Sequence, residues 1–192
     1  MKFKILFAVI GISFFAIACK SKIAADYSEA IAKKENALGP EVKEATNKLV
    51  RYFAAYDYDS IASVSSQMEA KVETLLREIK NKPAPKLPEA ENFKQASIRY
   101  LNYLKSIYTS YKNYGSQTTP EGRIIAQDEM TVINSQEEVM ADYLKVAQQK
   151  FAKANGFKIK TNKKIISPDT QDTLNNQAQN KANSGKQNLA AH

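Results

Sequence analysis

Apolar residues recur with a helical period along most of this chain, and the clearest case lies in its second quarter. Seven of them follow one another at spacings of 3, 4, 4, 3, 1 and 3: Ile61, Val64, Met68, Val72, Leu75, Leu76 and Ile79. This spacing returns to the same face of an α-helix at each turn, so the stretch is predicted to be a helix that faces a core. Alternating strand patterns are absent from the sequence.

Three further stretches share this period. They cover about 24–56, 89–114 and 120–155, and the loop at 81–88 between the second and third helices holds three prolines. Short connections favour antiparallel neighbours. The sequence therefore predicts an all-α fold, an antiparallel up-down four-helix bundle over 23–159 with long first and fourth helices.

The first helix contains an interruption at Gly39-Pro40. Proline removes a backbone donor and clashes with the preceding turn, so a kink or a break is expected there. Since the apolar stripe stays in phase across it, one interpretation is a single kinked helix. The alternative is a break, with Pro40 in the first turn of a new helix.

The N-terminus has the order of a secretory signal. Lys2 and Lys4 precede an apolar run that ends at Ala16-Ile17-Ala18-Cys19. The run has about 14 residues, short of the roughly 20 that a spanning helix needs. Residues 1–18 are therefore predicted to be a signal peptide.

The segment that ends in Cys19 resembles a bacterial lipoprotein signal, with Ala16 in place of the commoner Leu. The resemblance implies cleavage before Cys19, lipidation of its thiol, and a lipidated tether over 19–22. The membrane would be reached through that lipid. A cleaved signal with an incidental cysteine and an uncleaved membrane helix are the alternatives. Lys20 replaces the Asp that retains some lipoproteins at the inner membrane, so the resemblance favours the outer membrane, on its periplasmic face over the cell surface.

The composition excludes several kinds of chemistry. Cys19 is the only cysteine and His192 the only histidine among 192 residues. Zinc, copper and haem sites normally use these residues, and Cys-His or Ser-His-Asp catalysis requires them. We therefore expect no catalytic residues, no metal site, no cofactor and no enzyme. The formal charge of +8 is spread among acidic residues, so nucleic acid is not the expected partner.

Residues 160–192 differ from the rest of the chain. They are rich in Asn and Gln and have almost no large apolar residues after Ile166. Such a segment buries too little to offset its ordering entropy, so it is predicted to be a disordered tail. It is either inert or a tether to the cell wall or to a partner.

Two sets of residues are candidates for a site. The first is a row of tyrosines in the third helix, which could line a ligand groove or form part of the core. Its members are Tyr100, Tyr103, Tyr108, Tyr111 and Tyr114.

The second set is Glu129 and Gln136, one heptad apart within the predicted apolar arc of the fourth helix. They could form a buried polar site, with Arg99 or Arg77 as a partner, or a polar layer that fixes the register. Otherwise the arc is narrower there and both reach water.

Several motifs resemble those of small, largely uncharacterised helical lipoproteins from Bacteroidota and spirochaetes. The similarity covers most of 27–159 and includes the lipobox, the turn at 56–59, the proline loop and the closing segment 149–157. These are packing and turn motifs and imply no catalytic role. The expected function is therefore a lipid-anchored cell-envelope protein that binds or supports an envelope protein or polymer. A small-molecule or lipid carrier with a Tyr-lined pocket is the alternative.

Overall fold

The computed structural model describes the backbone of residues 3–159, and the side chains from Cys19 onward. The helices of this part of the chain are α1 (Phe3–Ala37), α2 (Gly39–Ala55), α3 (Tyr58–Asn81), α4 (Ala90–Gly115), α5 (Pro120–Asn134) and α6 (Glu137–Asn155). Strands are absent from the described residues, which confirms the all-α class. The predicted disordered tail, 160–192, lies outside them.

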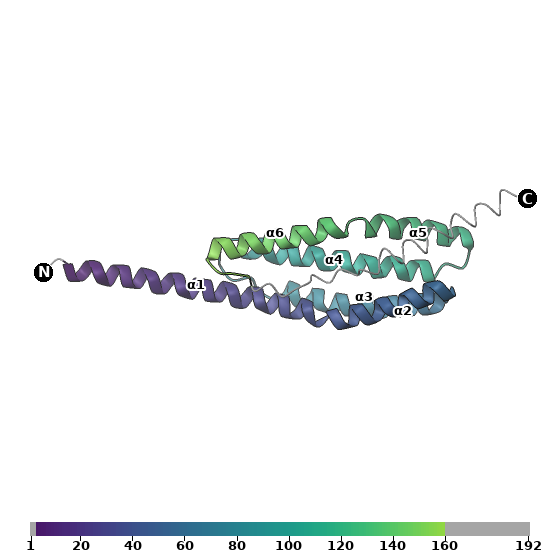
Figure 1. The fold of residues 1–192 in the computed structure, drawn as a ribbon, viewed down its shortest axis with the longest axis horizontal. Coiled ribbons are helices and arrows are strands. Elements are labelled where there is room, and N and C mark those ends of the chain that lie inside the picture. The colour runs from purple at the N-terminus through teal and green to yellow at the C-terminus, as the bar shows by residue number, and fades with distance from the viewer. Residues whose placement is uncertain (1–2, 160–192) are drawn as a thin grey trace, which may run out of the picture.

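The helices lie roughly parallel to one long axis (Figure 1). Helices α1 and α2 follow one another along one side, and α5 and α6 along the opposite side. Helix α4 packs against α3, α5 and α6, while α3 also packs against α2, and α1 against α6. The N-terminal part of α1 projects beyond the other helices. Within the described residues, no helix has both the length and the hydropathy to cross a membrane.

The interruption at Gly39-Pro40 separates two helices, as in the second interpretation. Only Leu38 lies between α1 and α2, and Pro40 stands in the first turn of α2. The Leu38 N–H donates to Glu35 O at 3.1 Å, and Leu38 O accepts from the Val42 N–H at 2.9 Å. Because the break is so short, Ile31, Leu38 and Val42 all remain buried in one core.

The predicted fourth helix is not continuous, which corrects the expectation of one long helix. It divides into α5 and α6 at Ser135 and Gln136. The Gln136 N–H donates to Ile133 O at 3.1 Å, a bond that tightens the turn. The Ser135 hydroxyl donates to Val132 O at 2.8 Å. Such a bond from a serine side chain to the backbone competes with the backbone hydrogen bonds that continue a helix.

Aromatic side chains gather at both ends of the core. Phe93 and Phe151 stack with ring centroids 5.5 Å apart, and Tyr27 lies edge-on to both. Asn155 donates from Nδ2 to Pro88 O at 2.9 Å, so it holds the proline loop against this end. At the other end, four rings come from three helices: Phe53, Tyr58, Tyr111 and Tyr114.

Gly115 allows α3 and α4 to approach closely at this second end. Gly115 is the last residue of α4. A Cβ atom at this position would lie 2.6 Å from both Ala62 N and Tyr58 O. Those are backbone atoms of α3, which cannot swing away, so the packing requires glycine.

Ion pairs connect α3 to its neighbours on both sides. The pairs are Glu73–Lys105 at 2.6 Å and Glu69–Lys112 toward α4, and Lys71–Glu41 at 2.9 Å and Glu78–Lys34 toward α2 and α1. These side chains remain partly exposed, so each pair contributes about 0–1 kcal/mol to stability. Their main effect is on the alignment of the helices along one another.

Candidate functional site

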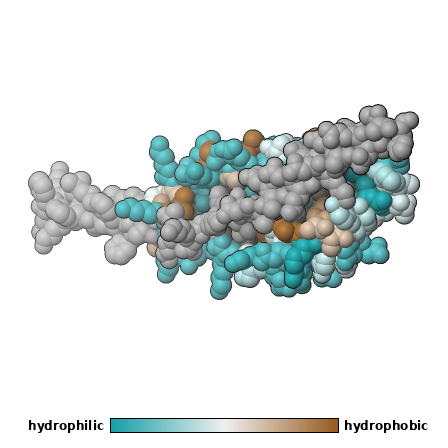
Figure 2. All heavy atoms as spheres, turned by 45° about the vertical axis from the view of Figure 1, so that its right-hand side comes forward, coloured by the Kyte–Doolittle hydropathy of each residue, from teal (hydrophilic) through white to brown (hydrophobic). Residues whose placement is uncertain are grey.

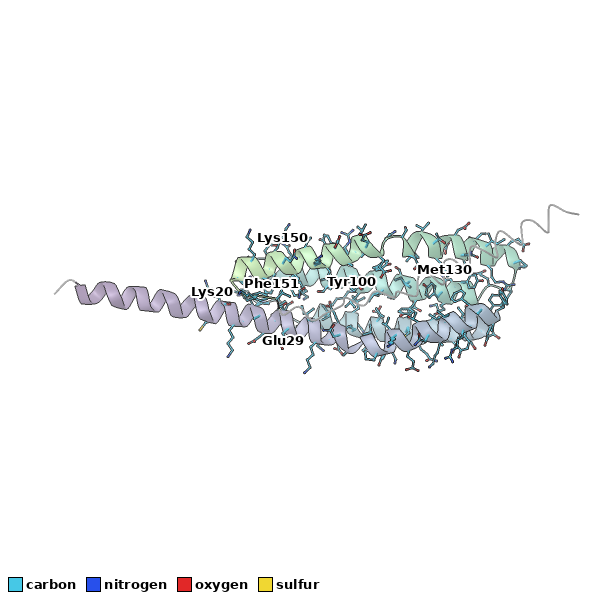
Figure 3. The ribbon with its side chains drawn as sticks, in the orientation of Figure 1. Lys20, Glu29, Tyr100, Met130, Lys150 and Phe151 are labelled. Carbon is cyan, nitrogen blue, oxygen red and sulfur yellow. The ribbon has the colours of Figure 1, made fainter. Side chains whose placement is uncertain are left out.

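The tyrosine row of α4 packs into the core. Tyr100, Tyr103, Tyr108 and Tyr111 are buried, and Tyr114 is half-buried. Burial raises the pKa of Tyr100 and of Tyr108 well above the ordinary value. Figure 3 shows Tyr100 between the helices, with Phe151 toward one end of the bundle and Met130 toward the other. The core alternative thus describes these residues, and the groove alternative does not.

Two open hollows lie elsewhere on the surface. One, of about 240 Å³, lies between α4 and α5 and includes Lys105, Thr109 and Glu129. The other, of about 510 Å³, lies over the junction of α1 and α2 and includes Lys34 and Glu78, which pair with each other. Neither hollow is lined by any of the five tyrosines.

Glu129 and Gln136 are both exposed, so the alternative in which they reach water describes them, and neither a buried polar site nor an internal polar layer forms there. The buried face of α5 lies one residue further along, at Ala126, Met130 and Asn134. The apolar face predicted for this part of the fourth helix was therefore displaced by one residue from the face that is buried in α5.

The two arginines suggested as partners for Glu129 and Gln136 have other contacts. The Arg99 guanidinium lies over the Tyr143 ring, 4.8 Å from its centroid. Arg77 donates from Nη2 to Thr74 Oγ1 at 3.3 Å.

The internal polar residue of α5 is Asn134, and the sequence interpretation missed it. It is buried, and its Nδ2 donates to Tyr111 OH at 3.4 Å. Once the face of α5 is set one residue later, Asn134 falls four residues after Met130, on the same side.

A shielded carboxylate does occur, at Glu35 on α1. The Glu35 side chain as a whole is half-buried, but its Oε1 is closed off from solvent. Burial raises its pKa from 4.5 to about 7, and the nearby Ser97 hydroxyl opposes part of that rise. Among the described residues, neither Glu35 Oε1 nor Ser97 Oγ has a hydrogen-bond partner of good geometry.

Helix α4 supplies the groups near Glu35, which are Ser97 and Tyr100. Glu137, at the start of α6, lies near Tyr100. After burial, the negative charges of Glu137 and Glu35 are the further causes that raise the Tyr100 pKa. Because burial disfavours its charged form, a larger fraction of the Glu35 carboxyl is protonated near neutral pH than of an exposed glutamate. The sequence carried a signal for it, since positions 31, 35, 38 and 42 share one helical face.

Cys19 is exposed and lies on α1 just before the helix enters the core. Ala24 is the first fully buried residue after it. The segment 19–22, which was expected to be a lipidated tether, lies within α1. Ser21 Oγ donates to Gly156 O at 3.1 Å. Lys20, the next residue in the chain, is also exposed and lies where α1 leaves the bundle (Figure 3).

Within the described residues, no cluster of three or more His, Cys, Asp or Glu side chains could hold a metal ion. Comparison of the chain with protein-family models, with curated proteins and with solved structures gave no match.

Proposed function

We propose that this chain is a lipid-anchored protein of the bacterial cell envelope that acts as a binding or structural module. In this proposal it is related to the small helical lipoproteins that its motifs resemble. Its helices form an up-down four-helix bundle in which α1–α2 and α5–α6 each serve as one interrupted member. The partner is an envelope protein or polymer, and no reaction is catalysed.

The observation that carries the proposal is the burial of the tyrosine row. A carrier for an aromatic or lipid ligand needs a concave apolar site with a few polar groups. The row that could supply such a site is packed against neighbouring helices. Recognition by the outer surface is therefore favoured over capture of a small molecule between the helices.

The position of Cys19 supports the anchor. Its side chain is exposed and is separated from the first fully buried residue, Ala24, by little more than a turn of helix. At 1.5 Å per residue, that distance is about 8 Å along the helix. Lipid added at Cys19 would thus hold this end of the protein at the membrane surface, with Lys20 and Lys22 near anionic head groups.

The proposed location is the outer membrane, with the protein on its periplasmic face. The support is the lipobox together with Lys20 directly after the lipidated cysteine, where Asp would favour the inner membrane.

The anchor is tested by Cys19→Ser in the full chain. The variant is expected to leave the detergent phase on phase separation and to lose the mass of the acyl groups. Lys20→Ser is the matched control and should partition as the parent does. Unchanged partitioning and mass of Cys19→Ser would refute the lipid anchor.

The binding role is tested by chemical crosslinking in intact envelopes, followed by purification of the full chain. A discrete, saturable crosslinked partner supports an interaction module. If the protein instead co-purifies with a stoichiometric small molecule or lipid that Tyr108→Ala releases, the carrier alternative is correct.

A further inference from the structure

One end of the bundle, the end beside Cys19, is strongly basic. Hydrogen bonds from Ser21 to Gly156 and from Asn155 to Pro88 hold α1, α6 and the proline loop together there. Helix α4 begins two residues after Pro88. We call this end of the bundle the anchor end, and it consists of the segments 20–26, 82–96 and 149–158.

The anchor end carries eight lysines against one aspartate and two glutamates. The lysines are Lys20, Lys22, Lys82, Lys86, Lys94, Lys150, Lys153 and Lys158. Six of them are exposed, and Lys82 and Lys94 are half-buried. At the left of Figure 2, hydrophilic side chains in teal stand out on several sides of this end. The opposite end, at 50–60 and 111–125, carries three basic and three acidic residues, so the positive charge is concentrated beside Cys19.

Within the described part of the chain, none of these eight lysines forms an ion pair. The lysines that do so all lie outside the anchor end, and they are Lys34, Lys48, Lys71, Lys105 and Lys112. The two glutamates of the anchor end accept hydrogen bonds from amides instead, Glu89 from Asn92 at 2.9 Å and Glu91 from Gln95 at 2.6 Å. Most of the positive charge of this end is therefore not compensated by the protein.

We propose that the anchor end binds the anionic head groups of the membrane to which Cys19 is attached. A membrane surface with anionic phospholipids attracts lysines that lie within about a Debye length of it, roughly 8 Å at physiological ionic strength. Lys20 and Lys22 closely follow Cys19. The hydrogen bond from Ser21 to Gly156 brings the end of α6, with its lysines, to the same level. The proposal rests on the lipid anchor at Cys19, which turns this end of the bundle toward the membrane.

An exposed apolar side chain lies next to these lysines. Ile23 directly follows Lys22 and is 52% exposed. Surfaces that bind at a membrane interface combine basic residues, which face the head groups, with apolar side chains that enter the boundary of the acyl chains. Ile23 therefore adds a hydrophobic contact beside the electrostatic one. The sign of the charge and its position beside Cys19 both favour a lipid surface as the partner.

Vesicle binding of the full chain carrying Cys19→Ser tests this surface without any lipid on the protein. The apolar run before residue 19 is the same in every variant. The quantity to compare is therefore the ratio of the binding constants for vesicles of phosphatidylcholine mixed with phosphatidylglycerol and for vesicles of phosphatidylcholine alone. Each lysine near an anionic surface strengthens binding about fivefold. Replacing Lys86, Lys153 and Lys158 together by glutamine should thus lower the ratio roughly a hundredfold.

The matched control replaces Lys33, Lys43 and Lys145 by glutamine, which removes the same charge from the sides of the bundle. These lysines are exposed and lie about 16 Å or more along the axis from the level of Gly156, beyond a Debye length. The control should change the ratio by less than about twofold. Circular dichroism checks that each variant is folded.

Two results would overturn the proposal. An equal loss in both triple variants would show that net charge alone attracts the protein, and an unchanged ratio in the anchor-end variant would show that this end does not bind the head groups. Because Cys19→Ser carries no acyl group, neither result depends on whether the parent is lipidated. Failure of the lipid anchor is seen separately, in the detergent partitioning of Cys19→Ser.

Discussion

Replacing Glu35 by glutamine should make the stability of this protein less dependent on pH. Folding raises the pKa of Glu35 from 4.5 to about 7 because burial disfavours the charged form. Between these values the folded protein holds a proton that the unfolded chain has released. The free energy of unfolding therefore falls as the pH rises through this range.

The size of the effect follows from the pKa values. Each pKa unit corresponds to 1.36 kcal/mol, so a rise of about 2.5 units costs about 3 kcal/mol once Glu35 is ionised in both states. The cost is nearly absent near pH 4.5 and complete by about pH 8. A glutamine amide keeps the shape of the side chain and carries no charge. The free-energy cost of burying the glutamine amide does not depend on pH. It therefore cancels when the difference in stability between the two proteins is compared at about pH 4.5 and about pH 8.

The measurement is urea unfolding of the parent and of Glu35→Gln at several pH values between about 4.5 and 8, followed by circular dichroism. The difference in unfolding free energy between the two proteins should move by about 3 kcal/mol in favour of Glu35→Gln across that range. Asp26→Asn, an exposed change on the same helix, should show no such trend. If the difference for Glu35→Gln is independent of pH, then Glu35 is solvated and the burial argument is refuted.

Four further changes test the packing, three by the free energy of unfolding and the fourth by the thermal midpoint. Gly115→Ala should destabilise by about 1–3 kcal/mol, because its Cβ would meet α3 backbone, and an unchanged midpoint would show that α3 and α4 separate freely. Leu104→Ala should cost about 2–5 kcal/mol, and a loss below 1 kcal/mol would place Leu104 outside the core. A double-mutant cycle on Glu73 and Lys105 should give a coupling of at most about 1 kcal/mol, falling with added salt, and a larger salt-independent coupling would contradict the exposed geometry. Deleting 160–192 should shift the thermal midpoint by no more than about 2 °C, and a larger drop would show that it packs on the helices.

Much of the helical structure could be predicted because helix ends and core faces are determined locally. Asp57 and Thr119 cap α3 and α5 as their side chains suggest, and Gly156 ends α6 in the left-handed conformation. The stripe of α3 is buried as its spacing predicts, apart from Val64, which is half-buried. Such features depend on neighbours in sequence, so the sequence contains them.

The face of α5 was harder to predict because two apolar lines compete there. Ile125 and Val132 are larger and more apolar than Ala126 and Asn134, yet they are the exposed pair. Hydropathy alone selects the wrong line when a helix has a second apolar face. The choice between the two lines depends on α4, which no pattern within α5 encodes.

The shielded carboxylate was missed for a related reason. The apolar arc predicted for the fourth helix had the wrong phase in α5, so the acidic residue within it was Glu129, which is exposed. Glu35 lies on a correctly phased stripe, between Ile31 and Leu38, but beside a break that a proline makes. A polar residue next to a helix break is usually exposed at the helix end, so the pattern did not indicate that Glu35 would be shielded.

The continuity of α1 from Cys19 into the core has a mechanical consequence for the proposed anchored protein. A flexible linker between a lipid anchor and a domain lets the domain rotate freely and transmits little torque to it. Here the attachment point and the buried residues Ala24, Tyr27 and Ile31 belong to one helix. Bending or shear of the membrane would therefore change the orientation of the whole helical domain. A force applied to the domain would be transmitted through α1 to the acyl chains.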